Sequence, residues 1–333
     1  MGQILSTVTV SKDHVFCYLA REFELILTAI EIDSGEPAWE RPIGIFAAAY
    51  WAAGALQGSR LFYCDEQGLA AVDSRSGSLL TRMENSDDWL ATSPPTLLGD
   101  QLFFHDHAGR LWAVDTETLE PRWNVERRGM ISYAPPAVSG NGLIAQWIQA
   151  RCCRIARLDL RTGECAWELE RSELGRGTCT VHKGLVFVPL VHAQLILALD
   201  IETGEVVWER RFERQPEGQS MDQMGFAVDD KRLFHSLSPT RYEALDQATG
   251  DVAWRFETNN SCPFHPIVGR GWTMFVARNG TITWLASDSG QLLARFSIGK
   301  DILHAPAMTG RGLFVASDGG TLWCLRDQGL GTG

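Results

Sequence analysis

The 333-residue sequence lacks the short motifs that mark the common enzyme classes. It contains no GxSxG, P-loop, HExxH, GxGxxG or EF-hand loop, so serine hydrolase, nucleotide, zinc-protease and calcium-loop chemistry have no support from motifs. The glycine-rich stretches at 175–180 and 269–271 precede no helical pattern, and we interpret them as turns.

The sequence also has few basic residues and no long apolar run. Its 30 Lys and Arg residues are outnumbered by 41 Asp and Glu residues, giving a net charge of −11. A general nucleic-acid binder needs the opposite balance, so we expect no nucleic-acid partner. No run of 18 apolar residues occurs, which predicts no membrane span.

Targeting and disulfide signals are missing as well. The first residues show no basic segment followed by an apolar one, so we expect no secretory signal and a cytoplasmic location. The cysteines show no CxxC and no framework spacing, which favours reduced thiols. They are residues 17, 64, 152, 153, 165, 179, 262 and 324.

What the sequence does contain is a repeat. The stretch ALDIETGEVVW at 198–208 returns as ALDQATGDVAW at 244–254 and RLDLRTGECAW at 157–167, with weaker copies elsewhere. The marker aspartates are Asp73, Asp115, Asp159, Asp200 and Asp246, with Glu31, Ala286 and Arg326 at equivalent places. These positions recur every 40 to 46 residues, the length of a four-stranded propeller blade.

Each residue of the motif has a structural role. The Asp ends a strand and accepts hydrogen bonds from backbone N–H groups of the following turn, and Gly supplies a positive φ. The Trp that follows is placed to pack between neighbouring blades. Thr81 and Ala294 replace this Trp in the second and seventh repeats, so we expect weaker packing there.

The spaced LDxxTGxxxW pattern resembles the PQQ-type repeat of quinoprotein-like β-propellers. That family includes quinoprotein alcohol dehydrogenases and a propeller lipoprotein of outer-membrane protein assembly. The resemblance covers nearly the whole chain and implies an all-β fold of four-stranded antiparallel blades. It implies little about function, because the motif is structural.

We predict a single domain, residues 1–333, with eight blades. The repeats span approximately 1–41, 42–84, 85–126, 127–170, 171–211, 212–257, 258–297 and 298–333. The last repeat has sequence for three strands only, and residues 4–10 already form the inner strand of the first blade. The open edge of the last blade therefore suggests self-association.

Binding residues are expected on the loops that vary between repeats. These loops connect the second strand of a blade to its third, and the fourth strand to the next blade. The candidates for contact with a ligand or partner are His105, Asp106, His107, His192, Tyr133, Arg128, Asp222 and Met224. His105 and His107 could also form a metal pair, but no third ligand is identifiable and we predict no metal.

Two further arrangements suggest catalysis. His265 and His304 begin inner strands of adjacent repeats, so they could act as an acid–base pair in an axial pocket, or simply bind water. Cys152 and Cys153 resemble the adjacent cysteines that quinoprotein alcohol dehydrogenases place against their quinone. Those enzymes are longer and exported, and their calcium ligands have no counterpart here. The alternative is a partly buried pair of reactive thiols, activated by the flanking arginines.

We therefore predict a non-catalytic propeller that binds a protein or peptide through its variable loops, without a cofactor. An enzyme using the axial histidines on a small molecule is the alternative. A quinone-dependent oxidoreductase is the third hypothesis, and we predict no PQQ.

Overall fold

The computed structural model describes residues 3–4, 6–45, 54–84, 90–150, 152–173, 175, 177–212, 225–238, 241–302, 304–317 and 320–326. It confirms the predicted fold, an all-β eight-bladed propeller whose blades have four antiparallel strands and whose last blade has three. The chain divides into two compact units, each described here by itself. Residues 1–90 and 300–333 form the first unit and residues 91–299 the second, so the predicted single domain stays a prediction. Among the described residues, no helix is long and apolar enough to cross a membrane.

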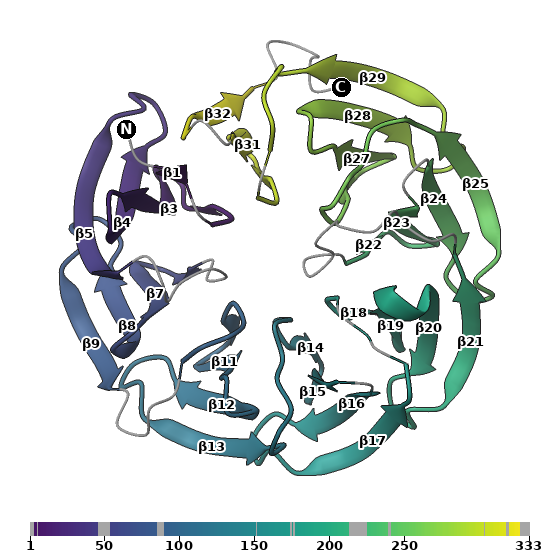
Figure 1. Cartoon of the computed structure of the whole chain (residues 1–333), viewed down its shortest axis with the longest axis horizontal. Helices are drawn as coiled ribbons and strands as arrows, with labels where there is room; N and C mark the ends of the chain where they lie inside the picture. The colour runs from purple at the N-terminus through teal and green to yellow at the C-terminus, as the bar shows by residue number, and fades with distance from the viewer. Residues whose placement is uncertain are drawn as a thin grey trace. The chain divides into compact units, whose positions relative to one another are not determined.

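The first unit holds blades one, two and eight (Figure 1). In blade one, two short inner segments both pair with the second strand, as predicted for residues 4–10. The last strand of this blade runs to Ile45, beyond the predicted boundary at 41. The strands are β1 (Gln3–Ile4), β2 (Thr9–Val10), β3 (His14–Arg21), β4 (Glu24–Glu31), β5 (Pro37–Ile45), β6 (Ala55–Gln57), β7 (Arg60–Asp65), β8 (Gly68–Asp73), β9 (Leu79–Glu84), β30 (Ala307–Thr309), β31 (Gly312–Ala316) and β32 (Leu322–Leu325).

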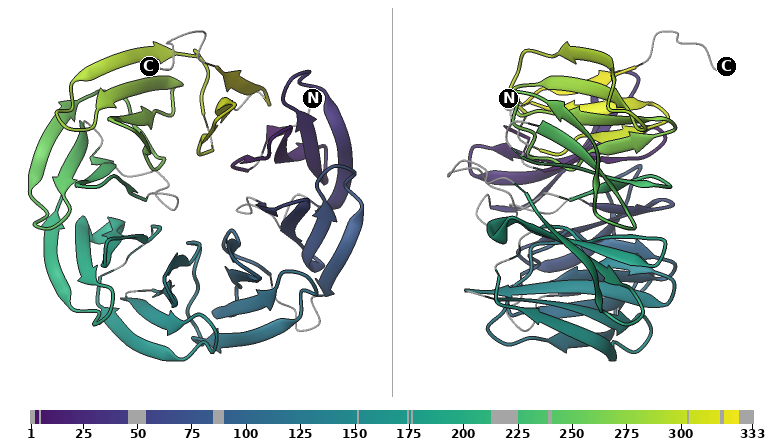
Figure 2. Two further views of the ribbon diagram at one scale, coloured as in Figure 1. Left: turned by 180° about the vertical axis from the view of Figure 1, so that it is seen from behind. Right: turned by 90° about the vertical axis from the view of Figure 1, so that its right-hand side faces the viewer.

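The second unit holds blades three to seven, each a four-stranded meander (Figure 2). A single 3-10 helix, η1 (Val191–Ala193), lies among its described residues. The strands are β10 (Thr96–Leu98), β11 (Gln101–His105), β12 (Arg110–Asp115), β13 (Pro121–Glu126), β14 (Ala137–Ser139), β15 (Gly142–Gln149), β16 (Cys152–Asp159), β17 (Cys165–Arg171), β18 (Thr180–His182), β19 (Leu185–Leu190), β20 (Leu195–Asp200), β21 (Val206–Arg211), β22 (Ala227–Val228), β23 (Arg232–Ser238), β24 (Arg241–Asp246), β25 (Val252–Glu257), β26 (Ile267–Gly269), β27 (Trp272–Val276), β28 (Thr281–Ala286) and β29 (Leu292–Ser297).

We label the strands of a blade A to D, from the inner to the outer edge. Strands B and C are buried on both faces and therefore read as continuous apolar runs, such as LWAV in β12 and LILAL in β20. Strand D is outermost. In β13 and β21 its first two residues are exposed, and the following side chains alternate between half-buried and exposed. The core thus runs through the middle strands of each blade.

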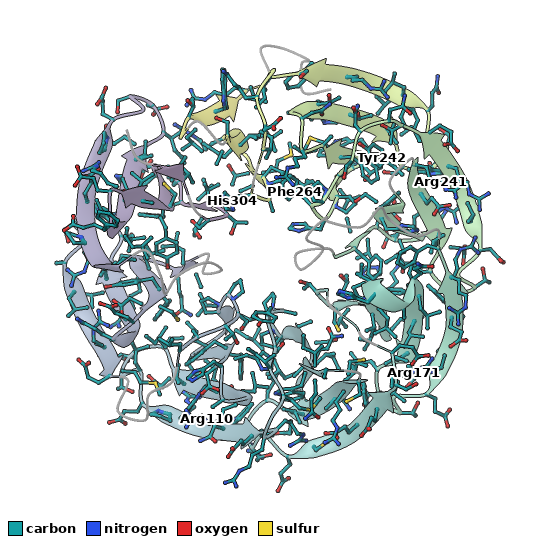
Figure 3. The ribbon with its side chains drawn as sticks, viewed as in Figure 1. Arg110, Arg171, Arg241, Tyr242, Phe264 and His304 are labelled. Atoms are coloured by element: carbon teal, nitrogen blue, oxygen red, sulfur yellow. The ribbon has the colours of Figure 1, made fainter. Side chains whose placement is uncertain are left out.

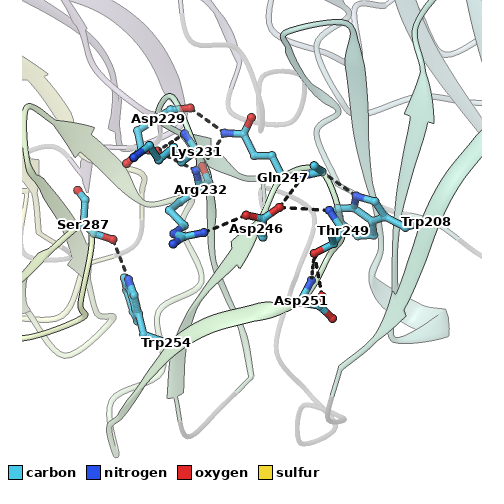
Figure 4. Close-up of polar contacts among 11 residues, drawn as sticks. Trp208, Asp229, Lys231, Arg232, Asp246, Gln247, Thr249, Asp251, Trp254 and Ser287 are labelled. Atoms are coloured by element: carbon cyan, nitrogen blue, oxygen red, sulfur yellow. Dashed lines mark hydrogen bonds and ion pairs between the residues drawn. The ribbon is translucent and has the colours of Figure 1, made fainter.

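The turn between strands C and D has the hydrogen bonds that the motif predicts. In blade six the Oδ1 atom of Asp246 accepts from the backbone N–H groups of Ala248 at 3.0 Å and Thr249 at 3.3 Å. The N–H of Gly250 donates to the Asp246 carbonyl at 2.9 Å, with Gly250 at φ +74°. The Thr249 hydroxyl accepts the N–H of Asp251 at 3.2 Å, which closes the turn (Figure 4).

A tryptophan from the preceding blade covers this turn. The Trp208 indole N–H donates to the Gln247 carbonyl at 2.8 Å. A Cβ atom at Gly250 would lie only 2.7 Å from the Trp208 ring, so the ring rests on the bare glycine backbone. We call this arrangement the Trp–Gly contact. It recurs for Trp39 with Gly77, Trp123 with Gly163, Trp167 with Gly204, and Trp254 with Gly290.

The Trp–Gly contact requires both residues, and at one described junction the chain omits them together. Thr81 stands in place of the Trp in β9, and the turn of the next blade has Leu119, at φ +59°, in place of Gly. Ala294 stands in place of the Trp in β29. The boundaries of the two compact units follow β9 and β29 along the chain.

The Trp–Gly contact can be tested inside the first unit, because Gly35 and Gly77 occupy the same turn position. Their φ values are +74° and +69°, so Ala costs about 1 kcal/mol in backbone strain at either place. At Gly77 the added Cβ would also overlap the Trp39 ring at 2.7 Å, whereas at Gly35 it meets nothing within 4 Å. We expect Gly77→Ala to lower the free energy of unfolding by about 2 kcal/mol more than Gly35→Ala, measured by urea titration. Equal losses would show that the ring does not depend on the glycine.

Candidate binding surface

The loops that vary between repeats gather at one end of each blade. Because strands A to D alternate in direction, the B–C turn and the connection from D to the next A leave the blade at the same end. We call the described parts of these loops in the second unit the variable face. It comprises residues 106–109, 127–136, 150, 172–173, 175, 177–179, 191–194, 225–226, 258–266 and 277–280.

The B–C turn of blade three is organised by the buried carboxylate of Asp106. This carboxylate accepts hydrogen bonds from the Arg110 Nε atom at 2.7 Å, the Trp112 indole at 2.8 Å and the Ala108 backbone N–H at 2.9 Å. Asp106 is fully buried, so the prediction that it contacts a partner was wrong. Its neighbour His107 is exposed in the turn, and its contact with a partner stays a prediction.

His105 was also predicted as a contact residue, and its burial contradicts this. It ends β11 with none of its surface exposed, and its ring meets the Trp147 indole edge-on at 5.3 Å between centroids. Neither ring nitrogen has a hydrogen-bond partner in the structure, and burial lowers the pKa of His105 to about 3. His105 therefore lies in the core as a neutral side chain, while His107 lies in solvent, so the two do not form a pair.

An ion-pair network connects blades three and four beside this turn. The Arg127 guanidinium lies over the Trp147 ring at 5.3 Å and pairs with Glu168 at 2.7 Å. Glu168 also faces Arg154 at 3.5 Å. The predicted contact residue Arg128 extends into solvent with 89% of its side chain exposed and pairs only with Glu126, at 3.0 Å, in the described part of the chain.

Two hollows adjoin this network. A small cavity of about 10 Å³ is lined by Tyr133, Gln146, Ile148 and loop residues around them, which is the space of a single water molecule. An open depression is lined by Gln149, Ala150, Cys152, Glu170 and Ser172. The first is too small for a substrate, whereas the second is open to solvent.

The remaining predicted residues are spread over both units. His192 is exposed on η1, in the B–C turn of blade five. His265, in the second unit, is exposed, and partial desolvation lowers its pKa. His304, in the first unit, is half-buried with its Nε2 atom 3.1 Å from the Ile4 carbonyl, and desolvation lowers its pKa (Figure 3). Their pairing stays a prediction, and Asp222 and Met224 lie outside the described residues.

The adjacent cysteines differ from the predicted reactive pair. Cys153 is fully buried, and burial raises the pKa of its thiol to about 12, with a further contribution from the nearby Glu173 charge. Cys152 is half-buried at the open depression. The predicted activation by flanking arginines is therefore wrong for Cys153, because desolvation dominates.

One polar cluster was missed from the sequence. His235 in β23 pairs across the sheet with Glu243 in β24, with 3.6 Å between Nε2 and Oε2, and both are buried. Arg255 donates to Glu243 at 2.7 Å. Arg241 and Tyr242 of the same strand are labelled in Figure 3. His235 and Glu243 are brought together only by the pairing register of β23 and β24. No local sequence motif predicts this contact. Across the described residues, no group of three or more His, Cys, Asp or Glu side chains is arranged to hold a metal ion.

The blades, turns and Trp–Gly contacts define a β-propeller built from PQQ-type repeats, as the sequence resemblance indicated. The profile of the family described as outer membrane protein assembly factor BamB matches residues 24–153 and 151–276. The chain belongs to this family.

Curated relatives and solved structures agree with this assignment. BamB of Alkalilimnicola ehrlichii is 28% identical over 57% of this chain and 50% of its own length. BamB of Moranella endobia is 20% identical over 97% of this chain and 86% of its own. The chain thus spans about half the length of the first of these relatives. Their name refers to outer membrane protein assembly and gives no support to the predicted cytoplasmic location.

Among solved structures, BamB from Moraxella catarrhalis has a TM-score of 0.72 at 18% identity, over 97% of this chain and 95% of its own. A europium-containing methanol dehydrogenase has a TM-score of 0.70 at 12% identity, over 95% of this chain and 83% of its own. These identities show a shared fold alone.

Burial of His105 predicts a dependence of stability on pH. Below pH 6.5 the unfolded chain protonates this residue, whereas the folded chain does so only near pH 3, so the unfolded state gains stability as the pH falls. His105→Leu should flatten the decline of unfolding free energy between pH 6.5 and 4 by up to about 1.4 kcal/mol per pH unit. Phe104→Leu, a change in a buried neighbour that has no ionisable group, is the control for altered packing and should leave the slope unchanged. An unaltered slope in His105→Leu would contradict the buried, neutral state.

The thiols of Cys152 and Cys153 should differ in their rates of alkylation. In the native protein at pH 8, iodoacetamide is expected to modify Cys152 at least about tenfold faster than Cys153, because only the thiolate reacts and Cys153 is fully buried. Peptide mass spectrometry measures both rates, and unfolding in urea should remove the difference. Equal rates in the native state, or a Cys152–Cys153 disulfide, would refute this assignment.

Proposed function

We propose that the protein is a non-catalytic platform that binds a protein partner through its variable face, in the assembly of outer membrane proteins. The observation that carries this proposal is that the two ends of a blade carry different kinds of residue. Asp, Thr, Gly and Trp of the repeat are engaged in turns and Trp–Gly contacts. Charged and polar side chains at the opposite end, including Arg128, His107 and His192, remain exposed.

The chemistry of this face suits a protein partner. Aromatic and arginine side chains that are already held in place contribute most to such interfaces, because binding then orders little. Arg127 is held by Trp147 and Glu168, and the Asp106 turn is fixed by four hydrogen bonds from three residues. Arg128 and His107 are exposed next to these fixed residues in the chain.

The setting of this function follows the family. Relatives are named for outer membrane protein assembly, and we extend that role, with its location in the cell envelope, to this chain. The proposal includes neither a quinone nor a metal, and it needs no acid–base chemistry from His265 or His304.

Photo-crosslinking in the native host tests the proposal. A benzoylphenylalanine is placed at Arg128 or His192 on the variable face, and at Arg161 or Glu202 in C–D turns of the same unit. All four side chains are exposed, so the positions differ only in the end of the blade. We expect one envelope protein to be captured from the first two positions and not from the last two.

The same partner then allows a binding measurement. Arg128→Ala and His192→Ala should each weaken its affinity about fivefold, corresponding to about 1 kcal/mol, without changing the melting temperature. Arg161→Ala is the control. Capture from the C–D turns alone, or turnover of a small molecule that needs His265, would contradict the proposal.

A further inference from the structure

The outer edge of the eighth blade differs from that of the other blades. Its sheet ends at β32, whereas a fourth strand follows the corresponding strand in the other seven sheets. All four residues of β32 are only half-buried. The four residues before the marker Asp in β8, β12, β20 and β24 are all buried. Within the described residues, β32 therefore has one edge without a partner strand and side chains without their usual cover.

The first blade shows what the absent strand would carry. Gly35 lies in the first blade's C–D turn at φ +74°, and its N–H donates to the Glu31 carbonyl at 2.9 Å, as in the other turns. In five other blades a tryptophan from the preceding D strand covers the equivalent glycine. At Gly35 an added Cβ would meet nothing within 4 Å. The turn thus has the backbone that receives an indole, and no indole from the described part of the chain covers it.

The acceptor for that indole is also taken by another group. In the five Trp–Gly contacts, the indole donates to the carbonyl of the residue after the marker position. The equivalent carbonyl in the first blade is that of Ile32, and it accepts a hydrogen bond from Arg326 at 3.0 Å. The exposed side chain of Arg326 therefore uses the carbonyl to which an indole would donate.

Polar side chains also lie beside the Gly35 turn. Arg311 and Arg326 both contact the carboxylate of Asp33, at 2.5 Å and 3.2 Å. Glu31 and Glu36 of the same turn are exposed as well, so the two guanidinium groups leave no excess of positive charge there. Strand addition to an open sheet edge takes affinity from backbone hydrogen bonds and specificity from side-chain sites, and the uncovered Gly35 turn is such a site.

We propose that the edge of β32 binds an extended segment of a partner protein, with a tryptophan that rests on Gly35. The segment pairs with β32 as a fourth strand and covers its half-buried side chains. The tryptophan reproduces the Trp–Gly contact, displacing Arg326 from the Ile32 carbonyl. This surface belongs to the first unit and goes beyond the proposed function, because it uses no residue of the variable face.

A peptide copied from the protein's own D strand provides the probe. Residues 204–209, Gly-Glu-Val-Val-Trp-Glu, combine the tryptophan of β21 with two carboxylates. A fluorescent form of this peptide is titrated with the whole protein, and anisotropy reports binding. We expect saturable binding that weakens at least about tenfold when the peptide's tryptophan is replaced by alanine.

Two matched variants locate the site. Gly35→Asn fills the position of the ring with a residue that tolerates positive φ, and Gly58→Asn makes the same change at φ +59°, also in open space and in the same unit. Gly35→Asn should abolish binding and Gly58→Asn should not, with unchanged melting temperatures for both.

Three outcomes would overturn the inference. They are equal binding to Gly35→Asn, no binding by the wild type, and a dimer of the wild type that Gly35→Asn dissociates while the peptide fails to bind. The last would identify a second copy as the occupant. Arg128→Ala should leave peptide binding intact. A failure of this inference can therefore be distinguished from a failure of the function proposed for the variable face.

Discussion

The contact between a tryptophan ring and a bare glycine turn is the interaction on which the rest of this structure depends. The indole buries its face where any Cβ would collide with it, and its N–H finds a backbone carbonyl in the same turn. Each residue is therefore useful only when the other is present. The chain follows this rule where Leu119 replaces glycine after a blade that has Thr81 in place of the tryptophan, and Gly35 is the exception. Gly35, which follows a blade without a fourth strand, has no ring above it.

Most of the fold could be predicted because its determinants are local. The Asp–Thr–Gly turn closes through hydrogen bonds within five residues, and the period of the marker Asp gives the blade count without knowledge of tertiary contacts. The three-stranded last blade was predicted for the same reason, since residues 327–333 have no strand pattern in their sequence.

The candidate site was harder to predict, because it depends on where strands end and on how they pair. Alternation along a straight strand suggested that His105 and His107 point the same way. The strand ends at His105, however, and Asp106 starts a turn, so one histidine is in the core and the other in solvent. Cys153 was misjudged because flanking charge is visible in a sequence and burial is not. His235 and Glu243 meet only through the register of two strands.

The same scaffold occurs in an assembly factor and in a methanol dehydrogenase, so the fold itself does not determine function. What varies between repeats in this chain lies at one end of each blade. The motif residues hold the blades together at the other end, and the variable face carries exposed charged side chains such as Arg128.

Native-state hydrogen exchange of the whole protein tests the central claim, that Trp–Gly contacts set the cooperative units, most directly. The account predicts that amides in β12, β16, β20, β24 and β28 exchange through one shared opening with similar free energy, and that β4 and β8 share a different one. Independent opening energies for each of these blades, unrelated to the tryptophans, would contradict it.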